Sequence, residues 1–137
     1  MAALPIFDVV VVGGGPAGAT AADDLARRGR RVALLDRAGR IKPCGGAVPP
    51  RLIRDFSIPD SLIVARANAA RIVAPSTRVV DMPIDGGYVA MVDREPFDEF
   101  LRRRAAQHGA VRLSGRFVKL ERDATGAAQV VFEDNDG

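Results

Sequence analysis

The chain has 137 residues, 47% of them apolar and 27% charged, which is enough for one domain with a hydrophobic core and too apolar for a disordered protein. Its net charge is only +3, and with one Tyr and no Trp it has few aromatic side chains to stack on bases, so we expect no nucleic-acid partner. A single cysteine, Cys44, and a single histidine, His108, exclude an internal disulfide, a cysteine zinc cluster and most histidine metal sites, so we expect no metal.

The sequence also bears on the compartment. No apolar run approaches the roughly 18 residues of a membrane span. The first five residues lack a basic segment, and the apolar run after them ends in glycines, which predicts a first strand and not a signal peptide. The single cysteine fits a reducing environment, so we expect a cytoplasmic protein.

The first part of the chain predicts a strand, a helix and a second strand. Residues 6–12 are almost wholly apolar and β-branched, as in a strand buried on both faces of a parallel sheet. Three glycines end this run, Pro16 suits the first turn of a helix, and Gly29 ends the helix expected over 17–28. With a second strand at 31–36, these segments form a βαβ unit.

The middle of the chain predicts a loop and then antiparallel strands. Prolines and glycines across residues 37–50 forbid long regular structure there. Strands separated by turns then form an antiparallel excursion from about residue 60 to 92. The elements expected in this part are a short helix at 50–56 and strands at 71–74, 78–83 and 88–93.

The last part predicts one helix and three strands. Asp93 can cap the helix, its apolar residues recur at helical spacing, and Gly109 ends it. The strands are expected at 111–113, 117–120 and 129–132. Since only two strands are clearly parallel and the sequence stops straight after a predicted strand, we expect a doubly wound α/β fold that is incomplete, in a fragment of a longer chain.

A glycine motif joins the first strand to the first helix. In the pattern Gly13-x-Gly15-x-x-Gly18, the first glycine makes the tight turn, the second lets the backbone approach a pyrophosphate, and the third lets the helix lie close to the strand. The helix N-terminus then offers N–H groups and the positive end of its dipole. Asp36, at the end of the second strand, can accept hydrogen bonds from both ribose hydroxyls. We therefore predict a dinucleotide site, because a glycine-rich surface turn would leave Asp36 unexplained.

The residues around this motif favour FAD over NAD. Residues 9–18 resemble the FAD fingerprint of the large flavoprotein oxidoreductase and hydroxylase group, and nicotinamide dehydrogenases rarely have Pro-Ala-Gly at this position. The acid and arginine after the second strand resemble a pair found in that group. The resemblance implies a Rossmann-like FAD-binding domain in which the residues that contact FAD include Gly13, Gly15, Pro16, Ala17, Gly18, Asp36 and Arg37.

Further segments narrow the resemblance. Residues 42–56, which begin Lys-Pro-Cys-Gly-Gly, resemble the geranylgeranyl reductase family, most of all the branch that makes the phytyl tail of bacteriochlorophyll and chlorophyll. Residues 82–87 and 93–98 are similar too. By this resemblance, residues 1–137 are the N-terminal part of an FAD/NAD(P)-binding domain, and about 60–92 begin its substrate-side β region.

The family implies a chemistry for the whole protein. It implies an FAD enzyme, reduced by NADPH, that saturates alkenes of a geranylgeranyl chain during bacteriochlorophyll synthesis. The substrate is either geranylgeranyl diphosphate or geranylgeranyl-bacteriochlorophyll, and so apolar a substrate favours peripheral association with the photosynthetic membrane. It also implies a second half with further FAD contacts and most of the prenyl tunnel, so activity of these 137 residues alone is in doubt.

Cys44 is the candidate catalytic residue, either as a proton donor or as a cofactor-binding group that is positioned beside the flavin. Alkene reduction needs a hydride at one carbon and a proton at the other, and a thiol with an ordinary pKa near ~8.5 is mostly protonated at neutral pH. The alternative is a small residue in a glycine loop. Gly45 and Gly46 can let this loop pass close to the flavin, or form a plain turn, and Arg94 can reach the cofactor or lie in solvent.

Three other functions stay open. An FAD aromatic hydroxylase shares the first motif, has no need for Cys44 and consumes oxygen with NADPH. A non-redox flavoprotein such as a carotenoid cyclase needs reduced flavin without net NADPH turnover. The chain can also be an inactive nucleotide-binding remnant.

Overall fold

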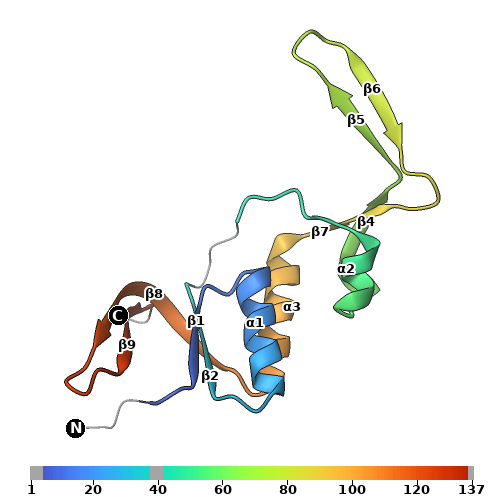
Figure 1. Ribbon diagram of the computed structural model, residues 1–137. Coiled ribbons are helices and arrows are strands. Elements are labelled where there is room, and N and C mark those ends of the chain that lie inside the picture. The colour runs from blue at the N-terminus through green and yellow to red at the C-terminus, as the bar shows by residue number, and fades with distance from the viewer. Residues whose placement is uncertain (1–4, 38–41, 136–137) are drawn as a thin grey trace. The chain divides into compact units, whose positions relative to one another are not determined.

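The computed structural model describes residues 5–37 and 42–135 (Figure 1). The expectations placed on the first four residues, on part of the loop at 38–41 and on the last two residues lie outside the described residues. In chain order the elements are β1 (Val9–Val12), α1 (Pro16–Arg27), β2 (Val32–Asp36), β3 (Ala47–Val48), α2 (Pro50–Asp55), the 3-10 helix η1 (Asp60–Leu62), β4 (Ile63–Ala67), β5 (Ala69–Val73), β6 (Val79–Pro83), β7 (Val89–Val92), α3 (Arg94–Gln107), β8 (Val111–Arg122) and β9 (Ala128–Asp134).

These elements divide into two compact units. The first unit comprises Met1–Ile41 and Asp98–Gly137, and the second comprises Lys42–Phe97. The expected α/β class is confirmed, since the first unit holds parallel strands with helices and the second holds the antiparallel excursion.

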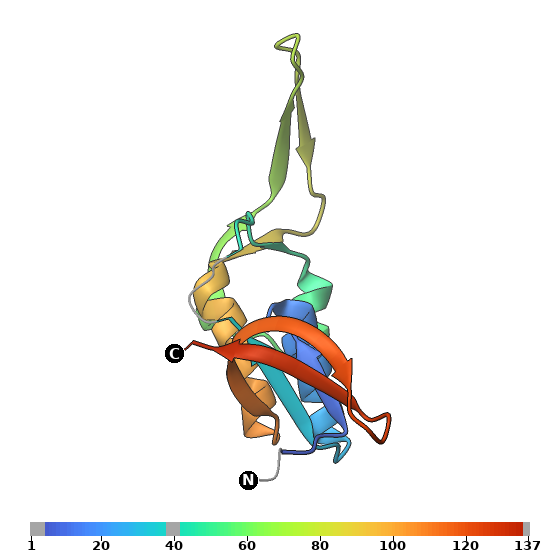
Figure 2. The same ribbon diagram turned by 90° about the vertical axis from the view of Figure 1, so that its left-hand side faces the viewer.

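The sheet of the first unit has the strand order β1-β2-β8-β9. The pairs β1–β2 and β2–β8 are parallel, and β9 pairs antiparallel with β8 (Figure 2). The apolar residues of β2 are buried, as expected for a strand in the middle of a sheet. Because β1 and β2 run parallel and in register from Val9↔Val32 to Val12↔Leu35, the glycine turn after β1 lies beside the end of β2.

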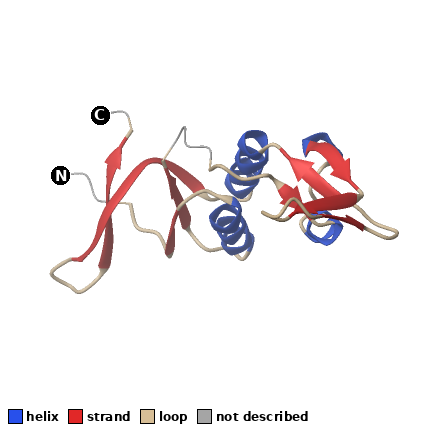
Figure 3. Cartoon of the chain, turned by 90° about the horizontal axis from the view of Figure 1, so that it is seen from above, coloured by secondary structure: helices blue, strands red, loops and turns tan. Residues whose placement is uncertain are grey.

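Helix α1 packs on β1 and β2 through small residues. Ala19, Ala22 and Ala26 are buried on one face of this helix. In Figures 1 and 3, α1 and the part of α3 from residue 98 onward lie on the same side of the parallel strands. This arrangement places the N-terminus of α1 and the middle of α3 at the carboxyl end of β2.

The second unit is antiparallel. One sheet has the order β3-β7-β4, and β5 pairs with β6 as a separate hairpin. Apolar side chains on this hairpin are exposed, among them Ile72, Val73, Val79, Val80 and Met82. Within the described residues, no helix is long and apolar enough to cross a membrane.

The structure corrects several element boundaries. Residues 111–122 form the single strand β8, whereas two strands were expected there, and its pairing with β9 shifts register between Phe117 and Lys119. Strands β3 and β4 lie where the sequence predicted a loop or no element. The expected cap of α3 is confirmed, because the N–H of Glu95 donates to Oδ1 of Asp93 at 3.3 Å.

Candidate functional site

The turn between β1 and α1 is built by its glycines. Gly13 has φ = +103°, a backbone conformation that favours glycine, and its N–H donates to the carbonyl of Leu35 at 2.8 Å. This bond ties the turn to the neighbouring strand β2. Gly15 then forms the N-cap of α1 with extended backbone, and Pro16 is the first helical residue. The tight turn predicted from the sequence is therefore present.

The surroundings of Gly18 are tightly packed, whereas those of Gly15 are open. A Cβ at Gly18 would overlap the carbonyl oxygen of Gly13 and lie 3.4 Å from Cγ1 of Val11, so only glycine fits between helix and turn. A Cβ at Gly15 would meet no heavy atom of the described residues within 4 Å. The backbone at Gly15 thus borders open space, as a turn that receives a phosphate group requires.

The N-terminus of α1 is suited to an anion. No side chain caps it, and its first turn holds no acidic residue. The first N–H groups of a helix have no partner within the helix, and the helix dipole gives this end a positive potential. Ala17 is exposed at this end and Gly18 is half-buried. The cradle of glycines and free N–H groups fits the pyrophosphate of a dinucleotide such as FAD.

Asp36 ends β2 and lies beside the glycine turn. A Cβ at Gly14 would lie 2.8 Å from its Oδ2 atom, so the carboxylate and the turn are in close contact. The side chain of Asp36 is 29% exposed, which leaves it open to a ligand. Arg37 follows and is exposed.

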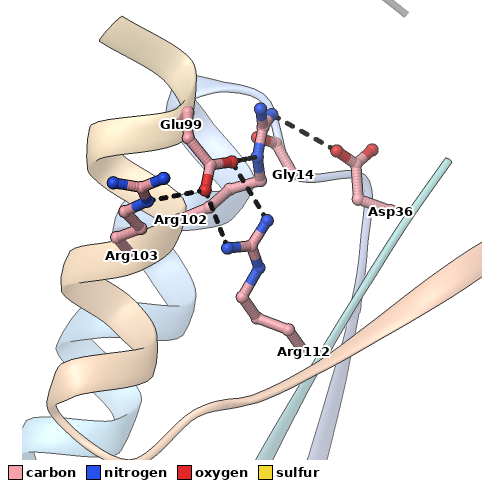
Figure 4. A network of polar contacts seen from close by, with 6 residues as sticks. All are labelled: Gly14, Asp36, Glu99, Arg102, Arg103 and Arg112. Atoms are coloured by element: carbon pink, nitrogen blue, oxygen red, sulfur yellow. Dashed lines mark hydrogen bonds and ion pairs between the residues drawn. The ribbon is translucent and has the colours of Figure 1, made fainter. Parts of the chain in front are cut away.

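Arg102, on α3, joins the turn to Asp36. Its NH1 nitrogen donates to the carbonyl of Gly14 at 3.0 Å and to Oδ2 of Asp36 at 3.3 Å (Figure 4). The Arg102 side chain is only 19% exposed. Sequence reasoning assigned no role to Arg102 or to Gly14.

Glu99 holds Arg102 from the other side. Its carboxylate accepts from Nε of Arg102 at 3.1 Å, from Nε of Arg103 at 3.0 Å and from both terminal nitrogens of Arg112 at 2.9 and 3.0 Å (Figure 4). The hydrogen bonds from Arg112 are the main cause that lowers the pKa of Glu99 from its ordinary 4.5 to about 2, against an opposing effect of burial. Glu99 is therefore ionised at neutral pH. The spacing of Glu99 and Arg102, three residues apart on a helix, was the available sequence signal for this pair.

The Cys44 loop belongs to the second unit. The Cys44 side chain is exposed, and its Sγ accepts a hydrogen bond from the N–H of Gly46 at 3.5 Å. Gly46 is buried with φ = +69°, its carbonyl accepts from the N–H of Val92 at 2.9 Å, and a Cβ there would overlap the Val92 carbonyl. Gly46 is thus required by the close approach of the loop to β7. Among residues 5–37 and 42–135, no atom lies within 4 Å of where a Cβ at Gly45 would stand, so Gly45 borders open space there.

The predicted site residues are distributed over both units. The structure brings together the glycine turn, Asp36 and Arg37 in the first unit. Cys44, Gly45, Gly46 and Arg94 lie in the second unit, where Arg94 is half-buried as the first residue of α3.

The sequence matches the pyridine nucleotide-disulphide oxidoreductase family over residues 7–131. It is 62% identical over 128 residues to a geranylgeranyl diphosphate reductase of Rhodobacter capsulatus, covering 93% of this chain and 32% of that protein. It is 38% identical to the chloroplastic geranylgeranyl diphosphate reductase of Arabidopsis thaliana, covering 82% of this chain and 25% of the plant protein. The chain therefore spans between a quarter and a third of the length of these relatives.

Two solved structures have a similar fold. The fold is similar to that of a geranylgeranyl bacteriochlorophyll reductase-like protein from Thermoplasma acidophilum, with a TM-score of 0.80, 25% identity, and coverage of 96% of this chain and 36% of that one. A flavin-dependent brominase shares the fold with a TM-score of 0.71 at 21% identity, covering 92% of this chain and 36% of its own.

Proposed function

Because this chain belongs to the pyridine nucleotide-disulphide oxidoreductase family and is homologous to geranylgeranyl diphosphate reductases, we propose that it is the nucleotide-binding front part of an FAD-dependent geranylgeranyl reductase. The observation that carries the proposal is the glycine turn itself. Gly18 admits α1 against the turn, Gly15 leaves open space, and Asp36 stands beside Gly14. These are the requirements of a site for the adenosine half of FAD.

Each predicted site residue of the first unit is proposed to have its own task in this site. The N–H groups at Gly15, Ala17 and Gly18 would hold the pyrophosphate at the positive end of the α1 dipole. Asp36 accepts hydrogen bonds from the ribose hydroxyls and repels a 2′-phosphate, which selects against NADP at this position. Pro16 fixes the start of the helix without offering an N–H group, and Arg37 provides a positive charge next to the carboxylate.

The second unit is proposed to face the flavin and the prenyl chain. Bound FAD, reduced by NADPH, supplies the hydride for the alkene. The Cys44 thiol gives its proton to the neighbouring carbon and is reprotonated from solvent, to which it is exposed. Open space at Gly45 permits close approach of the loop to a flat ring, and Arg94 is proposed to contact the cofactor.

The relationship to the Rhodobacter capsulatus enzyme, at 62% identity, supports a role in bacteriochlorophyll synthesis. The substrate is then geranylgeranyl diphosphate or the geranylgeranyl ester of bacteriochlorophyll, and the product carries a phytyl chain. Both substrates carry a long apolar prenyl chain, so the enzyme is proposed to work in the cytoplasm at the surface of the photosynthetic membrane.

The test uses the full-length enzyme with FAD, NADPH and each of the two geranylgeranyl substrates. The expected result is a product whose mass rises by one hydride and one proton for each reduced alkene, with matching NADPH consumption and no oxygen uptake. Oxygen consumption with a hydroxylated product would identify an aromatic hydroxylase instead. A flavin that must be reduced but gives no net NADPH turnover would identify an isomerising flavoprotein.

A further inference from the structure

We propose that Arg102 is a positioning residue of the nucleotide site, which holds the Asp36 carboxylate and the Gly14 carbonyl in place so that Asp36 presents its second oxygen to the adenosine ribose. The inference rests on the proposed function, because it takes the adenosine half of FAD as the ligand. Arg102 itself does not touch that ligand in this proposal.

A single nitrogen of Arg102 makes both contacts. NH1 lies 3.0 Å from the Gly14 oxygen and 3.3 Å from Oδ2 of Asp36, so it links α3 to the turn after β1 and to the end of β2 (Figure 4). A hydrogen bond between charged groups is stronger than one between neutral groups. The three segments that surround the adenosine side of the site are thus fixed to one guanidinium.

The contact with Arg102 engages one oxygen of the Asp36 carboxylate. Oδ2 accepts from Arg102, whereas across residues 5–37 and 42–135 the structure shows no hydrogen bond to Oδ1. A carboxylate held by one oxygen loses the rotation that ligand binding would otherwise have to restrict. Pre-ordering of this kind raises affinity without any new contact to the ligand.

Arg102 is held in turn by Glu99. Its Nε donates to Oε2 of Glu99 at 3.1 Å, and Arg112 fixes the same carboxylate with two hydrogen bonds. The Arg102 side chain therefore has ordered partners on both sides and lies between two carboxylates. Its orientation follows from the fold rather than from the ligand.

The packing around Gly14 is tight. A Cβ at this position would lie 2.8 Å from Oδ2 of Asp36 and 2.9 Å from Cδ of Arg102. Any side chain at Gly14 would push the arginine and the carboxylate apart. At Gly14, which the fingerprint pattern leaves variable, a side chain is therefore incompatible with the Arg102–Asp36 contact as it stands.

The experiment compares FAD with an FAD analogue that carries 2′-deoxyadenosine, in the full-length protein freed of its cofactor. Dissociation constants are measured by flavin fluorescence for the wild type and for Asp36→Ala, Arg102→Met and the double variant. Arg103→Met is the matched control, since Arg103 also contacts Glu99 but is 73% exposed and has no bond to Asp36.

We expect Arg102→Met to weaken FAD binding by about five- to tenfold, in the range of pairwise coupling between contacting groups. The wild type should prefer FAD over the deoxy analogue, and Arg102→Met should lose most of that preference. In the Asp36→Ala background, where only the bond to Gly14 is left to lose, the same substitution should weaken FAD binding clearly less than it does in the wild type. Arg103→Met should keep both the affinity and the preference.

Equal weakening of both ligands by Arg102→Met, or additive effects with Asp36→Ala, would overturn the inference and leave Arg102 as a purely structural residue. Failure of the wild type to bind FAD would instead reject the proposed function. Should Arg102→Met fail to fold, Arg102→Lys keeps the charge but cannot span Glu99, Gly14 and Asp36 with one fork of nitrogens. An Arg102→Lys protein with unchanged preference for FAD would equally reject the positioning role.

Discussion

Gly18 and the carbonyl oxygen of Gly13 lie so close together that a β-carbon on Gly18 would overlap that oxygen. The contact sets the distance between α1 and the turn that precedes it. Gly15, in the same turn, has no atom within 4 Å of the place where its Cβ would stand. Gly18 therefore contributes to packing and Gly15 to the space for a ligand, and substitutions at the two positions can separate these contributions.

Gly18→Ala should destabilise the protein, because the helix or the turn must move to make room. Overpacking of this kind typically costs about 1–3 kcal/mol. Thermal unfolding of the full-length apoprotein should show a lower Tm than that of the wild type. An unchanged Tm would mean that the turn adjusts freely and that the close contact has no energetic weight.

Gly15→Ala should leave stability unchanged and weaken FAD binding. Its Cβ would point into open space and its φ of −71° suits any L-residue, so stability should be unaffected. If the pyrophosphate occupies that space, FAD affinity should fall by about tenfold or more, since a methyl group would hold the phosphate away from the helix N–H groups. Flavin fluorescence titration measures the change, and full FAD affinity in Gly15→Ala would place the pyrophosphate elsewhere.

Asp36→Ala should weaken FAD binding in the full-length protein by about ten- to a hundredfold, since a hydrogen bond to a charged group is worth roughly 1.5–3 kcal/mol. The substitution also removes one of the two hydrogen bonds of Arg102 NH1 and leaves the bond to the Gly14 carbonyl in place. Circular dichroism and Tm serve as the check that the fold persists. A folded variant with wild-type affinity would show that Asp36 does not contact the ribose.

The local parts of this site could be predicted from the sequence, and the tertiary parts could not. The glycine pattern, Pro16 and the acid at the end of β2 lie within one βαβ unit, whose geometry follows from short-range rules. Arg102 approaches from α3 and lies 66 residues beyond Asp36 in the sequence. A polar residue on an amphipathic helix resembles any solvated side chain until the fold shows what lies opposite it.

The wrong strand predictions also arose because the sequence does not show which segments pair in the fold. Ser114 and Gly115 resemble a break between two strands, yet Gly115 lies within β8, where a Cβ would meet the carbonyl oxygen of Glu133 at 2.5 Å. The glycine is needed for the close approach of β9 and not for a turn. Strand β4 was missed because the polarity of Ile63–Ala67 does not alternate and its apolar run is only Ile-Val-Ala, too short to indicate a strand by itself. The strand pairs with β7, a contact that the sequence does not reveal.

Glu99→Gln should remove an acid-sensitive part of the stability. The pKa of Glu99 is about 2 in the folded protein and near 4.5 when the carboxyl is unpaired, so its folded pKa is depressed. A depressed carboxyl pKa stabilises the fold above pH 4.5, and this contribution is lost as the pH falls from about 4.5 to about 2.

Urea unfolding at several pH values would measure this effect. The wild type should exceed Glu99→Gln in stability by a constant amount above about pH 5, and the difference should shrink as the pH approaches 2. High salt should reduce the difference, because the side chain is 29% exposed and its ion pairs are partly screened. A stability difference that does not depend on pH would show that the carboxylate charge is unimportant.

Asp23→Ala should destabilise the first unit. The Asp23 carboxylate on α1 is buried, contacts Nδ1 of His108, lies 3.1 Å from Nε of Arg27 and lies 3.7 Å from Nε of Arg104. The Asp23 side chain is 5% exposed, but its partners Arg27 and Arg104 are 52% and 13% exposed, so solvent screens part of the loss and we expect a cost of roughly 1–3 kcal/mol. Asp24→Ala is the matched control, since Asp24 is the next residue and is exposed. Equal Tm values for the two variants would contradict the predicted role of Asp23.

Cys44 gives the sharpest test of the proposed chemistry. An isolated alkene is not polarised, so it accepts a hydride readily only if a proton is transferred to the other carbon at the same time. Loss of general acid catalysis typically lowers the rate by about 10²–10⁴-fold. In the full-length enzyme, Cys44→Ala should therefore keep its FAD and still be reduced by NADPH, yet lose most alkene reduction. Cys44→Ser should restore little, because a hydroxyl is a far weaker acid than a thiol.

The two half-reactions separate the possible roles of Cys44. Stopped-flow absorbance follows flavin reduction by NADPH, and mass spectrometry follows the prenyl product. Normal rates for both variants would make Cys44 a loop residue without a catalytic role. Loss of FAD from both would make it structural. Gly46→Ala marks that structural outcome independently, because a Cβ there would overlap the Val92 carbonyl, so it should disrupt the loop whatever the chemistry of the thiol. Only retained flavin reduction together with lost product in Cys44→Ala and Cys44→Ser supports a thiol that delivers the proton.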